Sequence, residues 1–600
     1  MLRKAFVPIL AFALLLGVLL SSPLSLQQSH YGRNNAVQQG NLSVHNLNTG
    51  TSYSTIQAAI NALETLDGHR ISVDAGIYHE HVTVTKSLSL LGADPRTTII
   101  DGDETGKVVY VTADNVEVKD FTIQDGTIGI WLHNSQNSSI VGNTLQDGSY
   151  GIRLYHAPNS EIVENSIRGY TWFGVEVESS GNSTLKRNIM VENRFNFGVD
   201  GVSLSDFIND IDESNTVNGK PIHYLMNQHN ITIDSFTFQE IGYLGLVNCS
   251  NVRVKALTVE DNIQGILLAS ATNAIITNVY AQDNWNGIYV VHSSDISVSE
   301  NQANSNFDYG IKFLNSSRSI ARENNVDNNG WAGLGVFKSP NSTIEDNEAS
   351  FNTYDLHIVY TNDSIITRNT ARIKPGASAD YSIAVYYSHN NLIYHNTFDN
   401  RLLYVETQNG TPFTPRNSWD NGFEGNYWSI YRGADADLDG LGDAVFVVGE
   451  NNMDNHPLMG RFSDFIVTFG DENYSLSVVS NSTISQFQFS PEDREISFMV
   501  AGEEEAPGFS RIAVPNTLLQ QLPNGNVTFL INAEPPVVKR TWTDKTNTHF
   551  YFSHTSGVYE PAIGPWLIVV IAVASIALIA FGLFFRSQRK SHRDLPHTAT

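Results

Sequence analysis

Short apolar runs with alternating polar positions recur along most of the chain. Ile130 and Leu132 form one such pair, and Ile140 and Leu145 belong to the runs that follow. Residues that favour turns (Asn, Asp, Gly and Ser) stand between the runs. The pattern predicts short strands that alternate with turns, and no segment within it is long enough for a helix.

Between about residues 120 and 396 this pattern returns every 22 to 23 residues. One thread of the repeat is an asparagine ladder: Asn278, Asn301, Asn324, Asn347, Asn369 and Asn396, after an earlier run of Asp120, Asn143, Asn165 and Asn188. A second thread is a glycine about nine residues later, at Gly129, Gly151, Gly174, Gly265, Gly287, Gly310 and Gly333. One coil cannot bury its inner face alone, so the repeat predicts stacked coils, which is an all-β parallel β-helix solenoid. Asparagines at equivalent turns can bond their neighbours above and below, so we interpret most of them as structural.

The solenoid is predicted over residues 51–415, with an insertion near 206–224 where the period breaks. Residues 54–66 resemble an amphipathic helix that begins at a capping box (Ser54 to Gln57) and presents Ile56, Ala59, Ile60 and Leu63 on one face. We expect this helix to cover the first coil. Residues 416–460 are predicted to close the other end, and alternating runs in 461–561 predict a small β-sandwich stalk.

The two ends of the chain indicate export and anchoring. Residues 1–25 resemble a signal peptide, with Arg3 and Lys4 ahead of an apolar run, although a single N-terminal anchor is the alternative. Residues 26–50 are a predicted linker. Residues 563–585 include an uncharged stretch (566–585) long enough to cross a bilayer, and the tail 586–600 is basic. The bulk of the chain is therefore predicted outside the cell, tethered by one C-terminal helix; a buried core helix is the alternative.

The net charge of −26 argues against nucleic acid and anionic membrane surfaces as partners, and it favours solubility or divalent cations. Cys249 is the only cysteine, so no intramolecular disulfide can form. Twelve Asn-x-Ser/Thr sequons fit a glycosylated surface protein.

An acidic loop offers the best local signal for a metal. Asp435, Asp437, Asp439 and Asp443 occupy positions 1, 3, 5 and 9 around a glycine, and the carbonyl of Leu441 would be the seventh-position ligand. The spacing predicts a Ca²⁺ site. Because the twelfth position is Phe446 rather than glutamate, we expect weak affinity.

If the strands that open with glycine are in register, the residues two and four places later point outward in two rows. These residues are Trp131, His133, Arg153, Tyr155, Glu176 and Glu178. Aromatic faces stack on sugar rings, whereas Arg and carboxylate groups bind hydroxyls, so the rows predict a carbohydrate-binding surface. Glu176, Glu178 and Arg153 are the weaker candidates for catalysis. An ordinary solvated face is the alternative.

His223, Met226 and His229 carry copper-type ligands, but spacings of three alternate sides of a strand, so copper is not favoured. The sequence contains no Ser-His-Asp arrangement, phosphate-binding glycine loop or cysteine-based zinc spacing.

Several segments resemble the NosD-like family of right-handed β-helix proteins. The opening Tyr53 to Ile60, the run Ile71 to Glu80, the insert Asn215 to Pro221, and the closing Gly425 to Trp428 with His456 to Met459 carry this resemblance. It implies a right-handed β-helix over about residues 50–460. The family takes its name from copper-binding accessory proteins, yet its repeats belong to a wider carbohydrate-binding and sugar-hydrolase group, with tethered members commonly on archaeal cell surfaces. The catalytic motifs of the similar pectin methylesterases and alginate epimerases are missing here.

We therefore expect a membrane-anchored cell-surface protein that binds glycan without catalysis. A polysaccharide lyase, hydrolase or epimerase on the same outer face is the first alternative. A copper-binding accessory protein and a structural envelope component are the others.

Overall fold

The computed structural model describes residues 43–374, 376, 380–399, 402–404, 416–449, 452–502, 507–522 and 525–555. The predicted signal peptide (1–25), most of the predicted linker and the predicted transmembrane helix (563–585) lie outside the described residues. Within the described ranges, no helix has both the length and the apolar character needed to span a bilayer.

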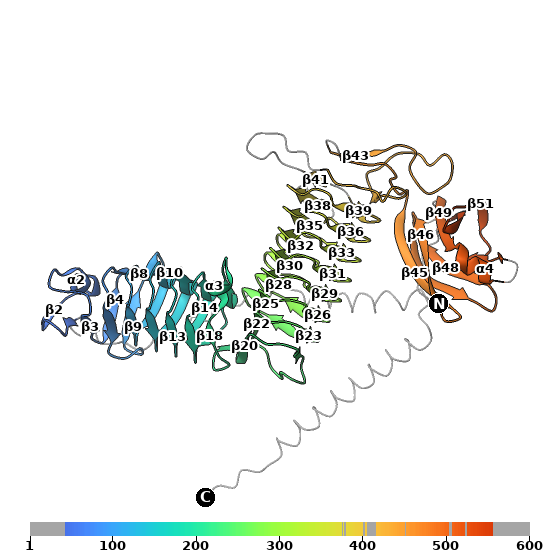
Figure 1. Ribbon diagram of the computed structural model, residues 1–600. Helices are drawn as coiled ribbons and strands as arrows, with labels where there is room; N and C mark the ends of the chain where they lie inside the picture. Colours follow the sequence, from blue (N-terminus) through green and yellow to red (C-terminus); the bar gives the residue numbers. More distant parts are fainter. Residues whose placement is uncertain are drawn as a thin grey trace, which may run out of the picture.

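The first part of the structure, the N-terminal solenoid, stacks strands around one apolar core (Figure 1). One of its sheets, the flank sheet, is parallel except where β1 pairs antiparallel with β2 and β3. The flank sheet consists of β1 (Val44–Asn46), β2 (Thr51–Tyr53), β3 (Arg70–Val73), β6 (Ser89–Gly92), β9 (Glu117–Lys119), β11 (Ser139–Val141), β13 (Glu161–Val163), β15 (Thr184–Lys186) and β18 (Asp210–Ile211). Its front sheet consists of β4 (Gly76–His79), β5 (Val82–Val84), β7 (Thr98–Asp101), β8 (Lys107–Val111), β10 (Thr122–His133), β12 (Thr144–Tyr155), β14 (Ser166–Glu178), β16 (Ile189–Val191), β17 (Phe195–Asp200) and β19 (Thr216–Val217).

Helix α2 (Ile56–Asn61) precedes the first parallel strands of the stack, and its Ile56, Ala59 and Ile60 are buried in the core. The predicted boundaries were wrong. The N-cap is Thr55, whose hydroxyl accepts from the Ala58 amide at 3.1 Å, and not the expected Ser54. Leu63 lies beyond the end of the helix and is 95% exposed. The carboxylate of Glu80 accepts from the amides of Ile56 and Gln57, so a contact distant in sequence supplies part of the cap.

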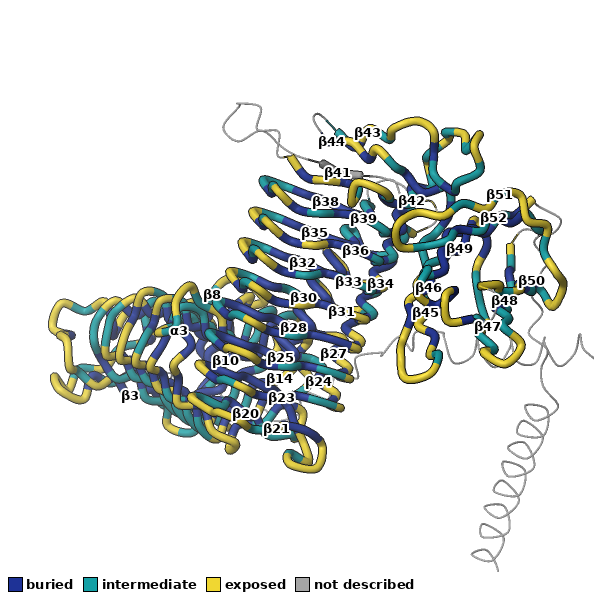
Figure 2. The backbone as a smooth tube through the Cα atoms, turned by 45° about the vertical axis from the view of Figure 1, so that its right-hand side comes forward, coloured by how far each residue is buried: buried dark blue, intermediate teal, exposed yellow. Residues whose placement is uncertain are grey.

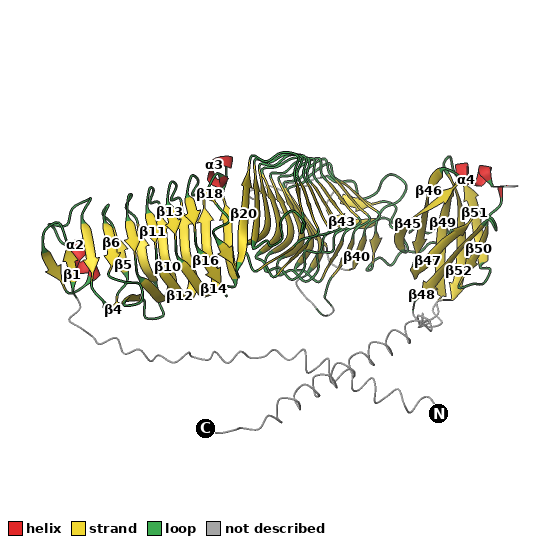
Figure 3. Cartoon of the chain, turned by 90° about the horizontal axis from the view of Figure 1, so that it is seen from below, coloured by secondary structure: helices red, strands yellow, loops and turns green. Residues whose placement is uncertain are grey.

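The period break at 206–224 marks a change in stacking direction. Helix α3 (Leu204–Phe207), β18 and β19 lead into a turn at Asn218 and Gly219, after which β20 (Lys220–Met226) pairs antiparallel with β19. A second solenoid then grows away from the first (Figures 1 and 3). The single rod expected from the repeat is therefore bent.

The C-terminal solenoid has three faces built of parallel strands. The wide sheet contains β20, β22 (Tyr243–Val247), β25 (Gln264–Ala269), β28 (Asn286–Val291), β30 (Tyr309–Leu314), β32 (Ala332–Phe337), β35 (Tyr354–Val359), β38 (Tyr381–Tyr386) and β41 (Leu402–Tyr404). The second contains β21 (Thr232–Ile233), β23 (Arg253–Lys255), β26 (Ile275–Thr277), β29 (Ser297–Ser299), β31 (Ile320–Arg322), β33 (Thr343–Glu345), β36 (Ile365–Thr367) and β39 (Leu392–Tyr394). The third face is formed by two sheets, one of β24 (Thr258–Glu260) and β27 (Tyr280–Gln282), the other of β34 (Glu348–Ser350), β37 (Thr370–Arg372), β40 (Thr397–Asp399) and β42 (Tyr427–Trp428). Isolated bridges at Gln302 and Asn325 connect them.

The outer surface of the wide sheet closes the open end of the N-terminal solenoid. Leu267 and Tyr289 point away from their own core and belong to the apolar cluster of the N-terminal solenoid. Backbone bonds also join the two parts, from the Asn196 amide to the Asp261 carbonyl (2.6 Å) and from the Ile263 amide to the Phe197 carbonyl (2.9 Å). The solenoids thus share buried surface at the bend, which Figure 2 shows as a dark interior continuing through both.

Buried asparagines bind one coil to the next, as the repeat predicts. The Nδ2 of Asn301 donates to Asn324 Oδ1 at 2.9 Å, and the series continues through Asn347, Asn369 and Asn396. Asn143, Asn165 and Asn188 form the same series in the N-terminal solenoid. The first member predicted for each run was wrong, because Asp120 and Asn278 lie one residue before the ladder position and adopt left-handed backbone, with φ of 62° and 53°. Phe121 and Val279 occupy the ladder positions there, and their backbone amides donate to Oδ1 of Asn143 and Asn301 on the next coil.

The solenoid ends at a cap with β43 (Phe446–Gly449) and β44 (Asn452–Asp454), followed by two facing sheets around a separate core. One sheet contains β45 (Arg461–Phe469), β46 (Glu472–Ser480), β49 (Pro507–Pro515), β51 (Val537–Thr543) and β52 (Asn547–Thr555). The other contains β47 (Thr483–Ser490), β48 (Glu495–Ala501) and β50 (Thr528–Ile531), with α4 (Asn516–Gln521) alongside. The buried Arg511 of β49 pairs with Glu424 of the cap.

Candidate functional site

The six residues predicted to form outer rows do lie in register on the front sheet. Strand pairing aligns Trp131 with Arg153 and Arg153 with Glu176, while a parallel row aligns His133, Tyr155 and Glu178. Neighbours in these strands point inward: Ile130, Leu132, Leu154 and Val177 are buried. Glycine recurs at the equivalent position inside each strand because a Cβ at Gly129 would lie 2.8 Å from the Gly151 carbonyl oxygen, and one at Gly151 would lie 2.5 Å from that of Gly174.

Charges in the rows neutralise one another along the stack. The Arg153 guanidinium lies 2.6 Å from Glu176 (Nε to Oε2) and donates from Nη2 to Glu178 Oε2 at 3.1 Å. Burial raises the pKa of Glu176 to about 7, although the Arg153 charge opposes the shift, and Glu178 adds to it. Glu176 is therefore a carboxyl group that exchanges a proton near neutral pH, next to a fixed cation.

Aromatic rings connect the rows to the bend between the solenoids. The Arg153 guanidinium lies over Trp131 and over Tyr150, at 5.6 and 5.7 Å from the ring centroids. Tyr150 contacts Phe173 (5.4 Å between centroids), and Phe173 contacts Trp285 of the C-terminal solenoid (5.2 Å). Trp285 contacts Phe307 at 4.6 Å. We call this set, from Trp131 to Phe307, the aromatic strip.

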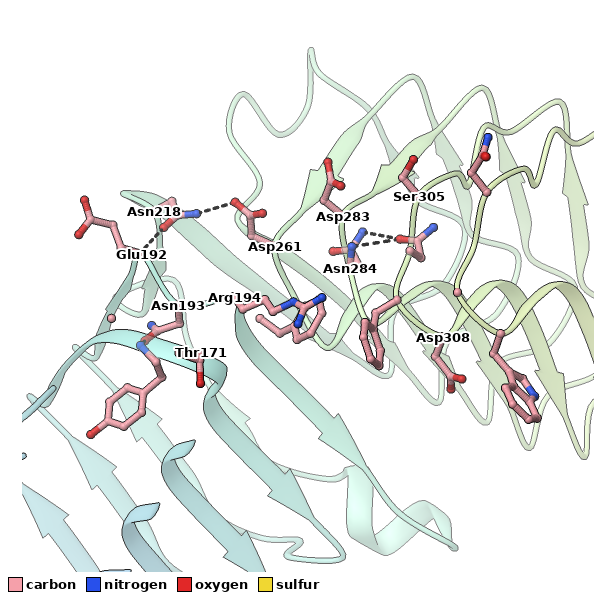
Figure 4. A pocket seen from close by; sticks show the side chains of 18 residues that line it. Thr171, Glu192, Asn193, Arg194, Asn218, Asp261, Asp283, Asn284, Ser305 and Asp308 are labelled. Atoms are coloured by element: carbon pink, nitrogen blue, oxygen red, sulfur yellow. Dashed lines mark hydrogen bonds between the residues drawn. The ribbon is translucent and has the colours of Figure 1, made fainter. Parts of the chain in front are cut away.

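The strip ends in a groove of about 1250 Å³ at the bend, which we call the junction groove (Figure 4). The N-terminal solenoid contributes Gly169 to Thr171 from β14 and Glu192 to Phe195 from the turn between β16 and β17. The C-terminal solenoid contributes the turns that precede successive wide-sheet strands, with Asp261, Asp283, Ser305 to Asp308 and Trp331. Phe307 and Trp331 are 37% and 43% exposed, so part of each of these two aromatic rings is accessible to a ligand there.

A buried asparagine ladder holds the turns of this wall in place. Asn284 donates through Nδ2 to Asn306 Oδ1, Asn306 to Asn329, and Asn329 to Asn352. The exposed residues beside each of these asparagines are therefore fixed at the repeat distance of the coils. This arrangement gives a rigid surface, which binds with a small loss of conformational entropy.

Acidic side chains dominate the groove. Glu192, Asp261, Asp283 and Asp308 line it, and Arg194 is the one cation among the lining residues. Burial is the first cause that raises the pKa of Asp261, Asp283 and Asp308. The negative charges of Glu260 and Asp283 raise the pKa of Asp261 further. The side-chain amide of Asn218 donates to the Asp261 carboxylate at 3.0 Å.

Sequence reasoning missed this groove because its two walls are far apart along the chain. A signal was nevertheless present: Trp285, Phe307 and Trp331 each stand two or three residues before a repeat glycine (Gly287, Gly310 and Gly333). Such an aromatic row at one turn of the coil could have been found from the period alone.

The predicted Ca²⁺ loop brings three of its carboxylates together. One oxygen from each of Asp435, Asp437 and Asp439 lies within 4.8 Å of the others. Asp435 accepts from the amides of Asp439 and Gly440, and Asp443 accepts from the Ala436 amide at 2.9 Å, so the loop is already curled. Arg540 of the β-sandwich pairs with Asp437 at 3.0 Å and competes for one of these groups.

The predicted copper-type residues do not form a cluster. His223 is buried, with Nδ1 3.0 Å from Glu213 and Nε2 3.0 Å from the Glu240 carbonyl oxygen. His229 lies against the Ser250 hydroxyl. No metal-type cluster in the described part of the chain includes either histidine.

The fold is a parallel β-helix, and comparison with known families agrees with it. The family model described as periplasmic copper-binding protein (NosD) matches residues 33–221 and 226–433, and the chain belongs to this family. Because both ring nitrogens of His223 are engaged and His229 belongs to no metal-type cluster of the described residues, these two histidines do not form a copper site together.

One curated relative is a cell surface glycoprotein of Methanothermus fervidus, 35% identical over 105 residues. The match covers 17% of each chain. Among solved structures, the A-module of a mannuronan C-5 epimerase from Azotobacter vinelandii is 13% identical, with 62% of this chain and 88% of that chain covered and a TM-score of 0.21. An α-1,3-glucanase catalytic unit from Streptomyces thermodiastaticus is 12% identical, with 62% and 66% covered and a TM-score of 0.20.

Proposed function

We propose that the protein is a cell-surface protein that binds a polysaccharide chain along the aromatic strip and in the junction groove. The observation that carries this proposal is the pair of exposed rings of Phe307 and Trp331 in the junction groove, which the aromatic strip connects through the buried Phe173 to Trp131. The groove exceeds the roughly 300–1,000 Å³ of small-molecule pockets, which suits a chain of sugars. Flat rings accept sugar faces, and carboxylates and amides accept hydroxyl hydrogens. The resemblance to a cell surface glycoprotein and the predicted exported ends of the chain support the location.

A glycan array probed with the full chain, followed by calorimetry on the best ligand, tests the proposal. We expect Phe307→Ala with Trp331→Ala to weaken binding at least tenfold, since each change removes an exposed ring from the groove. Trp131→Ala with Tyr155→Ala tests the outer rows in the same way. Phe236→Ala is the matched control, because that ring is 91% exposed and does not line the groove. Absence of binding to every glycan, or equal loss in the control, contradicts the proposal.

Catalysis on the outer rows is a second candidate, favoured by the proton-exchanging Glu176 beside Arg153 and Glu178. A carboxyl group with a pKa near 7 suits general acid or base work at neutral pH. Glu176→Gln should then abolish turnover of a polysaccharide while binding survives. Failure of the unmodified protein to cleave or epimerise any glycan that it binds removes this candidate.

Calcium binding by the acidic loop and anchoring by residues 563–585 remain predictions. Addition of Ca²⁺ to the full chain should raise the melting temperature through the loop, and Asp437→Asn with Asp439→Asn should remove the increase. An unchanged melting temperature at millimolar Ca²⁺ contradicts the calcium prediction.

Release of the protein from membranes by salt alone, without detergent, contradicts the predicted anchor at residues 563–585.

A further inference from the structure

Arg194 is a cation that the protein positions but does not neutralise. Its guanidinium lies 4.8 Å from the Phe307 ring centroid, 5.0 Å from that of Trp172 and 5.2 Å from that of Phe195. The residue is exposed, and it forms no ion pair with any residue in the described ranges. Figure 4 places it between the side chains of the N-terminal solenoid, such as Glu192, and those of the C-terminal solenoid, such as Asp308.

The contrast with other arginines makes this arrangement informative. Four outward arginines, Arg153, Arg187, Arg318 and Arg368, each bind at least one carboxylate within 2.8 Å, and Arg168 donates instead to the Gln146 side chain at 2.9 Å. Arg194 lines a groove with four carboxylates and pairs with none of them. Rings hold the flat face of its guanidinium, so the N–H groups at its edge remain available to a ligand.

The carboxylates of the groove carry charge that little else compensates. The charge of Lys220 lowers the pKa of Asp261, but the Lys220 Nζ already lies 3.5 Å from Glu260 Oε1. The charge of Lys312 lowers the pKa of Asp308. Asp283 has no cation among the groups that shift its pKa, and Arg194 does not shift the pKa of these three aspartates. A ligand therefore meets one available cation surrounded by negative charge.

We propose that the junction groove selects a glycan segment with a single acidic sugar, whose carboxylate pairs with Arg194 while neutral neighbouring sugars stack on Phe307 and Trp331. The guanidinium fork matches one carboxylate with two parallel hydrogen bonds. The aspartates accept hydroxyl hydrogens from the neutral sugars but repel a second acidic sugar at the adjacent position. The inference rests on the proposed function and names the class of glycan that the groove prefers.

Three trisaccharides that differ in the number of acidic sugars test the inference with the full chain. Cellotriose has none, 3′-sialyllactose has one, and trigalacturonate has three. Calorimetry at pH 7 and low salt should rank sialyllactose first, with trigalacturonate at least tenfold weaker. Arg194→Ala should reduce sialyllactose affinity about tenfold and leave cellotriose within twofold, whereas Asp261→Asn with Asp283→Asn should improve trigalacturonate severalfold.

Arg318→Ala is the matched control, because this exposed arginine pairs with Asp295 and does not line the groove. Arg194→Lys keeps the charge but not the fork, so it should recover only part of the sialyllactose affinity. Trigalacturonate binding as tightly as sialyllactose, or an Arg194→Ala protein unchanged toward sialyllactose, overturns the inference and leaves glycan binding intact. Binding confined to neutral glycans also overturns the inference alone. Absence of binding to any glycan, on the array as well, overturns the proposed function with it.

Discussion

The outer rows and the junction groove contain the same kinds of side chain, but their charges are arranged differently. In the rows, Arg153 lies between Glu176 and Glu178 on the adjacent coil, so stacking itself supplies its partners. In the groove, Arg194 stands where the coils stop stacking, and no carboxylate of the described residues comes within ion-pair distance of it. Stacking thus neutralises Arg153 in the outer rows, whereas Arg194 at the bend stays available to a ligand.

The largest effect should come from separating the two regions at the bend. Gly198 lies where a Cβ would meet Ile263 Cβ at 2.4 Å and Gln264 Oε1 at 2.8 Å, so Gly198→Val forces the solenoids apart. We expect a loss of about 3 kcal/mol in the free energy of unfolding, as for severe overpacking. Urea unfolding followed by glycan calorimetry measures both consequences.

Binding that depends on the groove should disappear in this variant, while sugars that need only the outer rows should still bind. Val202→Ala is a suitable control, because Val202 is 77% exposed on the nearby loop. Full retention of groove binding would show that the two solenoids do not need their present contact.

Removing the central arginine from each region should have unequal consequences. Arg153→Ala leaves Glu176 and Glu178 side by side without a cation, and Glu176 is only 14% exposed, so we expect a loss of about 2 kcal/mol. Arg194→Ala removes only contacts with aromatic faces, worth about 0.5–1 kcal/mol. Urea midpoints of the two variants, measured side by side, test the difference. Equal destabilisation would contradict the claim that only the row arginine is neutralised within the protein.

Sequence reasoning succeeded where the repeat alone determines geometry. The register of Trp131, Arg153 and Glu176 follows from the period, because a glycine at each coil fixes which residues point outward. It failed by one residue at Asp120 and Asn278, since the left-handed turn position and the ladder position beside it both favour Asn. It could not find the groove, because Asn196 and Asp261 meet across 65 residues only after the chain changes its stacking direction.

The pH dependence of stability that Glu176 causes should distinguish the outer rows further from the junction groove. Its pKa in the folded protein, about 7, lies above the ordinary value of 4.5. The stability that the protonated group contributes is therefore fully present below about pH 4.5 and is lost as the pH rises through 7. Glu176→Gln removes the charged form and should stabilise the protein by about 1–2 kcal/mol at pH 8 relative to the unmodified chain. At pH 4.5 the two proteins should unfold at the same urea concentration, and a difference that does not change with pH would contradict the raised pKa.

The smallest expected effect concerns the carboxylates of the groove. Because the pKa values of Asp261, Asp283 and Asp308 are raised, these groups take up protons at a higher pH than ordinary aspartates do. Lowering the pH from 7 should therefore relieve repulsion in the groove before ordinary surface aspartates or the sugar carboxylates titrate. Trigalacturonate affinity should rise about two- to threefold before those other groups take up protons, while cellotriose affinity stays constant. In the double variant Asp261→Asn with Asp283→Asn, only Asp308 of these three groups can still take up a proton. The rise in trigalacturonate affinity on acidification should therefore be smaller than in the unmodified protein. An affinity for trigalacturonate that falls on acidification would mean that Arg194 and its aromatic support, not the surrounding aspartates, set the preference of the groove.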